Sequence, residues 1–83
     1  MTADQLANAC RNDFLTNLRG ILARRKLSAA DFAAQIGMSP PQFSDLMRRR
    51  NYPTLLTICR ISLVLDVPPH KLLAPAKKIS SRA

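Results

Sequence analysis

The sequence is poor in the residues that mark β-structure. It has no tryptophan, three phenylalanines and a single tyrosine. Strands are recognised as alternating runs rich in Val, Ile, Thr and aromatic residues, and no such run is found in this sequence. Its apolar residues are mainly Leu, Ile and Ala, which favour helices. The sequence therefore predicts an all-α fold.

The residues from which enzyme and metal sites are built are also scarce. The two cysteines, Cys10 and Cys59, are far apart and have no histidine near them, so the spacing predicts neither a metal site nor a disulfide framework. The single histidine, His70, follows two prolines and has no serine or cysteine partner in a recognisable motif. Glycine-rich loops that would cradle a phosphate are missing. We therefore expect no catalytic residue, no metal, no cofactor and no small-molecule ligand, and the protein is predicted not to be an enzyme.

Long apolar runs are absent as well. No stretch approaches the roughly 18 apolar residues that suggest a membrane helix, and no basic amphipathic anchor is evident. The first residues lack the charged-then-apolar layout of a signal peptide, so a cytoplasmic location is expected. A chain of 83 residues is expected to form one domain with a modest core, with no room for an effector or catalytic domain beside it.

Negative charge is in short supply. The chain has 13 Lys and Arg residues against five acids, all of them aspartate, and a formal net charge of +8. Several of the aspartates lie where a helix would begin, which suggests a structural role for them. The remaining positive field favours a polyanionic partner, and nucleic acid is the first candidate.

The apolar pattern predicts several helices in succession. The first main helix is expected over residues 12–25, capped by Asn12 or Asp13, with an apolar stripe at helical spacing formed by Phe14, Leu15, Leu18, Ile21 and Leu22. Residues 1–11 are an extension that either continues this helix, with Thr2 as its cap, or frays from it. Gly20 interrupts the helical pattern, and close approach by another helix backbone would explain it.

The following helices are expected over residues 29–36, 40–48, 55–65 and 69–73, and residues 74–83 read as a flexible basic tail. Thr54 is expected to cap the fourth helix, whose inner face is predicted from its spacing to be Leu55, Ile58, Cys59, Ser62 and Leu65. The outer edge of this helix is unusually apolar and is a candidate dimer surface. The domain itself is therefore assigned to residues 12–73.

The stretch from Leu27 to Leu46 contains two short helices joined by a tight turn. Ser28 is placed to cap the first helix, Gly37 to end it in a left-handed conformation, and Ser39 to cap the second helix. Pro40 takes the first helical position, where its missing N–H is not needed. Helices joined this closely cross at a steep angle, which is the helix-turn-helix arrangement. Their buried face is expected to contain Phe32, Ala33, Ile36, Met38, Phe43, Leu46 and Met47.

This stretch resembles the phage-repressor-like (Cro-like, XRE) helix-turn-helix family. That family places a small residue, a turn glycine, a cap and two core apolar residues where this chain has Ala33, Gly37, Ser39, Phe43 and Leu46. The resemblance spans roughly residues 14–73. It implies a five-helix lambda-repressor-like DNA-binding domain, with helices 2 and 3 as the helix-turn-helix, that binds double-stranded DNA sequence-specifically.

In the family, exposed residues near the start of the second motif helix read base edges in the major groove. Carried over to this chain, these positions are Pro40, Pro41, Gln42, Ser44 and Asp45. The prolines depart from the polar residues common in the family and can offer only apolar contact, so polar readout shifts to Gln42 and Ser44. Asp45 either accepts from a cytosine amino group or pairs with Arg48 or Arg49, and we expect the pairing.

Phosphate contacts are expected mainly from Arg48, Arg49 and Arg50, because three arginines in a row cannot all satisfy one helix end. Asn51 can add a neutral hydrogen bond, and Tyr52 can do the same or pack under the loop. Ala29 stands where the family often has glutamine, so only backbone N–H groups at that helix start can meet a phosphate. The cluster of residues 24–26 either opposes the dipole of the first helix or contacts phosphate.

The resemblance implies a transcriptional regulator. A single recognition helix covers too few base pairs to find one site in a genome, so a homodimer with two such helices about 34 Å apart is expected. Without a regulatory domain, repression by promoter occlusion is the simplest output. The alternative is an antitoxin that binds a protein partner and autoregulates through the same motif, although the tail lacks apolar anchors for a partner. An activator or an RNA-binding role is disfavoured by the scattered aspartates and the scarce aromatic residues.

Overall fold

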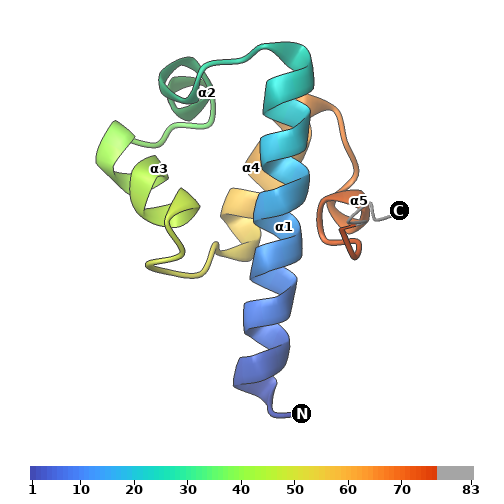
Figure 1. Ribbon diagram of the computed structural model, residues 1–83. Coiled ribbons are helices and arrows are strands. Elements are labelled where there is room, and N and C mark those ends of the chain that lie inside the picture. Colours follow the sequence, from blue (N-terminus) through green and yellow to red (C-terminus); the bar gives the residue numbers. More distant parts are fainter. Residues whose placement is uncertain (77–83) are drawn as a thin grey trace.

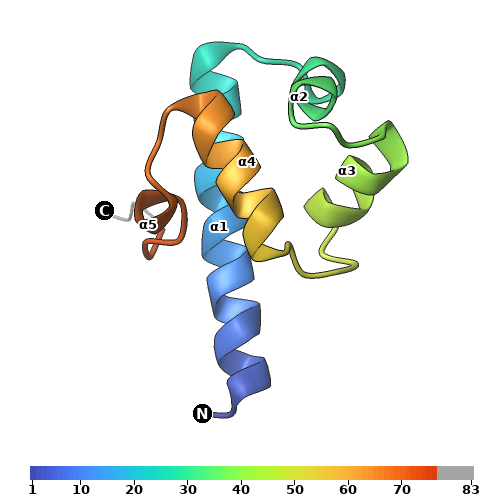
Figure 2. The ribbon, with the colours of Figure 1, turned by 180° about the vertical axis from the view of Figure 1, so that it is seen from behind.

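The structure, a computed structural model, describes residues 1–76 of the chain. In this part it contains five helices and no strand: α1 (Ala3–Arg25), α2 (Ala29–Gln35), α3 (Pro40–Met47), α4 (Leu55–Leu65) and α5 (Pro69–Leu72). The predicted all-α fold is confirmed. The long helix α1 forms the axis of the molecule, with α2 and α3 on one side of it and α5 on the other (Figure 1). Seen from behind, α4 lies in front of α1 (Figure 2).

Helix α1 begins at Ala3, so of the two alternatives for residues 1–11 the structure has the continuous helix capped by Thr2. Instead of a cap at Asn12 or Asp13, the structure has a capping box at Thr2, which satisfies the start of the helix there. The Thr2 hydroxyl accepts from the Gln5 N–H at 3.1 Å, and the Gln5 side-chain carbonyl accepts from the Thr2 N–H at 2.8 Å. With no helix breaker between this cap and the core stripe, the extension and the domain share one helix. The first half of α1 projects from the body (Figure 1).

The core lies where α1 meets the other four helices. All five residues of the predicted α1 stripe are buried. The rings of Phe32 in α2 and Phe43 in α3 meet edge to face, with 5.8 Å between their centroids and 69° between their planes. This aromatic pair fixes the two helices of the motif against each other. The buried apolar residues are Phe14, Leu15, Leu18, Ile21, Leu22, Phe32, Ala33, Ile36, Phe43, Leu46, Ile58, Ile61, Leu65 and Leu72, with Met38 and Met47 packed at the edge.

The predicted caps of α2, α3 and α4 are confirmed. Ser28, Ser39 and Thr54 each accept a hydrogen bond from the backbone N–H three residues later. Gly37 has φ +75°, so the turn of the motif uses the residue that adopts this conformation at least cost. Helices α1 and α4 also end in a left-handed residue, but without glycine there: Lys26 and Asp66 both have φ +57°.

The inner face of α4 differs from the prediction. Ile58, Ser62 and Leu65 are buried as expected, but the first member of the predicted face, Leu55, is 73% exposed, and Ile61 is fully buried in its place. Leu55 lies in the first turn of α4, next to the preceding loop, where no other helix covers it. The buried face of α4 is therefore rotated toward Ile61, compared with the face that the sequence spacing suggested.

Gly20 does not accommodate another helix backbone, contrary to the expectation. A Cβ atom built at Gly20 would meet only the Arg24 Nη1 atom, at 3.4 Å. The space over this glycine is thus taken by the guanidinium of a side chain one turn later in the same helix. A glycine inside a helix costs about 1 kcal/mol relative to alanine, so α1 carries this cost without a packing reason in the core.

Helix α5 and the residues after it are fastened to α1. The Asn17 Nδ2 atom donates to the Leu72 carbonyl oxygen at 2.8 Å and to the Ala74 carbonyl oxygen at 2.9 Å. The Ala76 N–H donates to Asp13 Oδ1 at 3.2 Å. The first residues of the expected flexible tail, 74–76, therefore have fixed partners, and the rest of that tail lies outside the described residues.

The described part of the chain contains no helix that is long and apolar enough to cross a membrane. No group of three or more potential metal ligands comes together among residues 1–76. Cys10 is exposed and Cys59 is half-buried, both as free thiols.

Ser62→Ala is expected to stabilise the protein by about 1 kcal/mol. The Ser62 side chain is 7% exposed, and its buried hydroxyl has no hydrogen-bond partner among the described residues. Removing an unsatisfied buried hydroxyl relieves its desolvation cost, and alanine is also the better helix former. Urea denaturation followed by circular dichroism measures the change. A loss of stability would mean that this hydroxyl has a partner in solution.

Candidate nucleic-acid interface

Helix α3 buries one face and leaves the other open. Phe43 and Leu46 anchor it to the core, and the helix lies at the outer edge of the molecule on the side away from α5 (Figures 1 and 2). The residues expected to read bases fall into two groups. Pro40, Pro41 and Gln42 are exposed, whereas Ser44 and Asp45 are half-buried. A duplex approaching this edge would therefore meet the start of α3 first.

Gln42 has a structural task in addition to the one expected from the sequence. Its side-chain carbonyl accepts from the Ser39 N–H at 3.0 Å, and the Ser39 hydroxyl accepts from the Gln42 N–H at 3.3 Å. This capping box leaves the Gln42 amide nitrogen as a donor with no partner among the described residues. A glutamine that pairs with adenine uses both its oxygen and its nitrogen. Bidentate pairing would thus require the Ser39 bond to open, whereas a single donated bond would not.

Asp45 pairs with a different arginine from the two that were expected. Its Oδ1 atom lies 3.7 Å from Arg50 Nη1, not beside Arg48 or Arg49. Arg49 has φ +63°, which turns the chain back, and the Arg50 N–H then donates to the Asp45 carbonyl oxygen at 3.0 Å. This helix-ending geometry places Arg50 over Asp45. The Arg50 side chain is 64% exposed and that of Asp45 is 47% exposed, so solvent screens the pair and it contributes little to stability.

We call residues 48–52 the arginine loop. All five residues are exposed. Among residues 1–76, Arg48 and Arg49 have no carboxylate within ion-pair distance, so their charges face solvent unpaired. Such guanidinium groups, following directly on α3, are well suited to phosphate oxygens. Ala29 is also exposed, at the start of α2.

The first half of α1 holds the arginine loop in place. The Tyr52 hydroxyl donates to Asn8 Oδ1 at 2.7 Å, and Arg11 Nη2 donates to the same oxygen at 3.1 Å. The Arg11 guanidinium carbon lies 4.4 Å from the centre of the Tyr52 ring, a cation–π contact. Of the two roles left open for Tyr52, the structure has the packing one. A phosphate contact from the Tyr52 hydroxyl would have to replace the bond to Asn8.

Two backbone carbonyls around the loop also accept from α1. Arg11 Nη1 donates to the Asn51 carbonyl oxygen at 3.5 Å, and Arg19 Nη2 donates to the Met47 carbonyl oxygen at the end of α3. Sequence reasoning missed Asn8, Arg11 and Arg19, because their partners lie 28 to 44 positions away. Only the length of the uninterrupted α1 would have hinted that residues before Asn12 reach the loop.

The arrangement is thus a steeply crossed helix pair with an exposed second helix and a basic loop behind it. A model of the Cro/C1-type helix-turn-helix DNA-binding domain matches residues 17–78, well over half of the chain. The chain belongs to the Cro/C1-type helix-turn-helix family. Neither the search of curated proteins nor the search of solved structures gave a match.

Membership of the Cro/C1-type family confirms the resemblance seen in the sequence and supports a DNA-binding transcriptional regulator. The family itself is one of non-enzymatic regulators. The matched region begins at Asn17. The part of α1 that carries Asn8 and Arg11 therefore lies outside the matched region.

Proposed function

We propose that this regulator is a small homodimeric repressor that binds a specific operator and acts by occluding a promoter. The observation that carries the proposal is the common exposure of the start of α3 and of the arginine loop directly behind it. The loop supplies unpaired positive charge for the phosphate backbone, and the helix supplies side chains for the major groove. Apart from a dimer contact, repression by occlusion needs no surface beyond the start of α3 and the arginine loop.

The proposed division of roles follows from the chemistry of each side chain. Arg48 and Arg49 bind phosphates and give affinity that depends on salt but not on sequence. Gln42 and Ser44 donate to base edges, and the two prolines before them offer apolar contact, for example to a thymine methyl group. Arg50 and Asp45 neutralise each other in the free protein, which makes both weaker candidates than their neighbours.

The experiment that tests the proposal is selection of bound sequences from random duplex DNA at two salt concentrations. We expect an inverted repeat whose half-sites lie one helical turn apart, because a two-fold dimer presents its two α3 helices at that spacing. No preference over bulk DNA would contradict the proposal. A protein partner that co-purifies in a fixed ratio would instead favour an antitoxin role.

Gln42→Ala is expected to relax the preference at one base position of each half-site, at a cost of about 1–3 kcal/mol in discrimination. The change also removes half of the capping box of α3, so its effect on folding must be separated. Gln5→Ala is the matched control, because it removes the same bond from the capping box of α1, outside the helix-turn-helix. Selection with both variants measures the effect. An unchanged base preference in Gln42→Ala would show that this side chain does not read the operator.

The homodimer is proposed to form through the outer face of α4. Leu56 is 60% exposed and Leu63, two turns further along the same face, is 83% exposed, with Val64 beside it. In Figure 2 this helix lies along the front of the molecule with no other helix over it. Large apolar side chains exposed along one helix face favour burial against a partner.

Leu63→Lys is expected to shift the protein from dimer to monomer and to weaken operator binding at least tenfold, because a lysine amine cannot be buried at an apolar contact without loss. Sedimentation equilibrium and gel shift measure the two effects. Leu6→Lys places the same charge on another exposed leucine, in the projecting part of α1, and should leave the dimer intact. A dimer that survives Leu63→Lys would place the contact elsewhere.

A further inference from the structure

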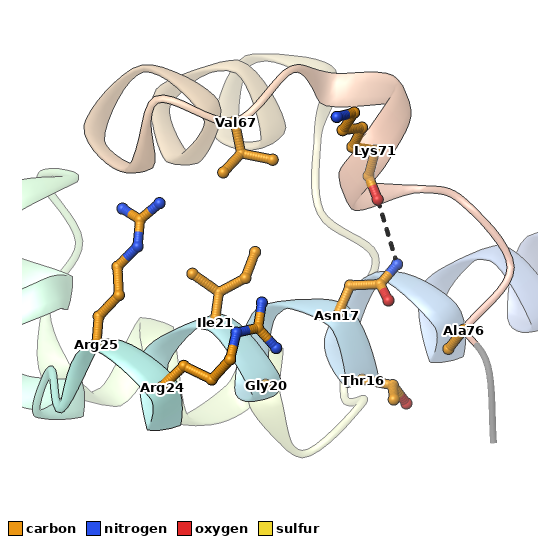
Figure 3. Close-up of a pocket in the computed structure, with 9 residues that line it drawn as sticks. All are labelled: Thr16, Asn17, Gly20, Ile21, Arg24, Arg25, Val67, Lys71 and Ala76. Carbon is orange, nitrogen blue, oxygen red and sulfur yellow. Dashed lines mark hydrogen bonds between the residues drawn. The ribbon is translucent and has the colours of Figure 1, made fainter. Parts of the chain in front are cut away.

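A second basic site lies on the opposite side of α1 from the DNA-binding surface. Between α1, the segment that follows α4, and α5 there is an open pocket of about 540 Å³ (Figure 3). Its charged lining consists of Arg24, Arg25 and Lys71, and no aspartate is among its lining residues. Three positive side chains thus share one hollow without a negative charge in it.

The positions of these cations have specific causes. The Arg24 guanidinium folds back over Gly20, which offers it space because it has no side chain. Arg25 donates through Nη1 to the Leu65 carbonyl oxygen at 2.7 Å, which fixes its guanidinium at the end of α4. Lys71 belongs to α5, which Asn17 holds against α1 through the Leu72 carbonyl. The pocket is therefore built by ordered contacts on three sides.

Among residues 1–76, no carboxylate lies within ion-pair distance of the three cations of the pocket, although Asp13 lies close to its edge. Asp13 lies on α1, and its carboxylate accepts from the N–H of Ala76, a residue at the edge of the pocket. Asp66 follows α4 but lines a separate hollow with Ser62 and Pro68. Of the two interpretations of residues 24–26 left open by the sequence, the helix dipole accounts for cations at the end of α1. It does not account for Lys71, which reaches the same pocket from another helix.

We propose that this pocket binds a small phosphorylated anion. Its volume falls within the roughly 300–1,000 Å³ range of small-molecule sites. Two guanidinium groups and an ammonium group give charge-assisted hydrogen bonds to phosphate oxygens. Helix α5, which borders the pocket, lies on the opposite side of α1 from α3 in both ribbon views (Figures 1 and 2). An anion bound in the pocket therefore does not occupy the DNA-binding surface.

The test uses inorganic pyrophosphate as the probe and the full-length protein labelled with ¹⁵N. Pyrophosphate is titrated at constant ionic strength, and the backbone amide signals are followed by NMR. We expect saturable shifts at Gly20, Val67 and Lys71 and none of comparable size in the arginine loop. The double variant Arg24→Gln with Lys71→Gln should bind at least tenfold more weakly. Both side chains are exposed, so the fold does not depend on them.

Arg60→Gln is a control for loss of charge elsewhere: it removes one exposed positive charge from α4, outside both basic sites, against two in the double variant. It should bind pyrophosphate as the unmodified protein does. Shifts spread evenly over all arginines would overturn the proposal, because they would indicate unspecific attraction of anions to a chain of charge +8. Shifts at the pocket caused equally by a DNA duplex would also overturn it, because the site would then contact a nucleic-acid backbone. Neither result depends on whether the protein is a repressor.

Discussion

The double variant Arg48→Gln with Arg49→Gln is expected to bind every DNA sequence about 10- to 100-fold more weakly at low salt. Each phosphate neutralised by a cation contributes about −0.9 to the slope of log K against log salt, so this slope should become shallower by about two units. The ranking of DNA sequences should stay the same, because phosphate contacts carry no direct sequence information.

The two arginines are chosen because the structure leaves them unpaired. Arg50 has Asp45 at 3.7 Å, whereas Arg48 and Arg49 have no carboxylate partner among the described residues. Glutamine keeps most of the side-chain length and removes the charge. The left-handed backbone at position 49 is equally unfavourable for arginine and glutamine, so the folding stability should hardly change.

Gel shift or fluorescence anisotropy over a series of salt concentrations measures affinity and slope together. The control is the double variant Arg24→Gln with Lys71→Gln, which lowers the net charge by the same amount on the far side of α1. It should keep nearly the full salt slope. If both double variants lose affinity equally, the arginine loop has no special position and only the total charge of the protein attracts DNA.

Phe32→Ala is expected to lower the free energy of unfolding by about 3–5 kcal/mol. Phe32 is fully buried and meets Phe43 edge to face, so the change removes a large core side chain and the contact that joins α2 to α3. Small domains have total stabilities at the low end of about 5–15 kcal/mol. A substantial fraction of the variant should therefore be unfolded, and DNA binding should fall although Phe32 lies in the core.

Urea denaturation followed by circular dichroism gives the change in stability, and the lost DNA binding should scale with the unfolded fraction. Phe32→Leu is the control, because it keeps most of the volume and should cost about 1.5 kcal/mol or less. A loss below about 1 kcal/mol in Phe32→Ala would contradict the structure, since it would mean that the two motif helices do not depend on this ring.

The elements that the sequence predicted well are those determined by neighbouring residues. The bounds of α4 and the caps Ser28, Ser39 and Thr54 follow from local hydrogen bonding and from helical periodicity. The left-handed Gly37 belongs to the same class. Together these signals sufficed to identify the helix-turn-helix and, through it, the family.

The parts that the sequence could not predict depend on contacts between distant residues. Nothing near Tyr52 indicates that its hydroxyl donates to Asn8, and nothing near Arg19 indicates the Met47 carbonyl. The exposure of Leu55 depends on which other helices reach that turn, which periodicity alone does not determine. For Gly20 the sequence suggested close approach by another helix. The space over Gly20 is in fact occupied by the Arg24 guanidinium, and this depends on a side-chain conformation that the sequence does not show.

The site residues divide in the same way into those that the sequence could predict and those that depend on distant or unusual contacts. The family resemblance placed Pro40, Gln42 and the arginines of the loop, and all of them are exposed. It did not anticipate that Gln42 serves the capping box, although Ser39 and Gln42 stand at the spacing of that motif, because this position was assigned to base reading alone. The choice of Arg50 as the partner of Asp45 depends on the left-handed Arg49, a backbone conformation that arginine seldom adopts.

The uninterrupted α1 touches both basic regions of the molecule. Arg19 holds the last carbonyl of the recognition helix, and its immediate neighbour, Gly20, forms part of the pocket on the other side. Control of DNA binding by a small ligand would therefore need no second domain in this chain, since one continuous helix borders both the proposed DNA-binding surface and the proposed anion pocket. Thermodynamic linkage makes any such coupling reciprocal: an anion that changes operator affinity by some factor must have its own affinity changed by that factor when the operator is bound.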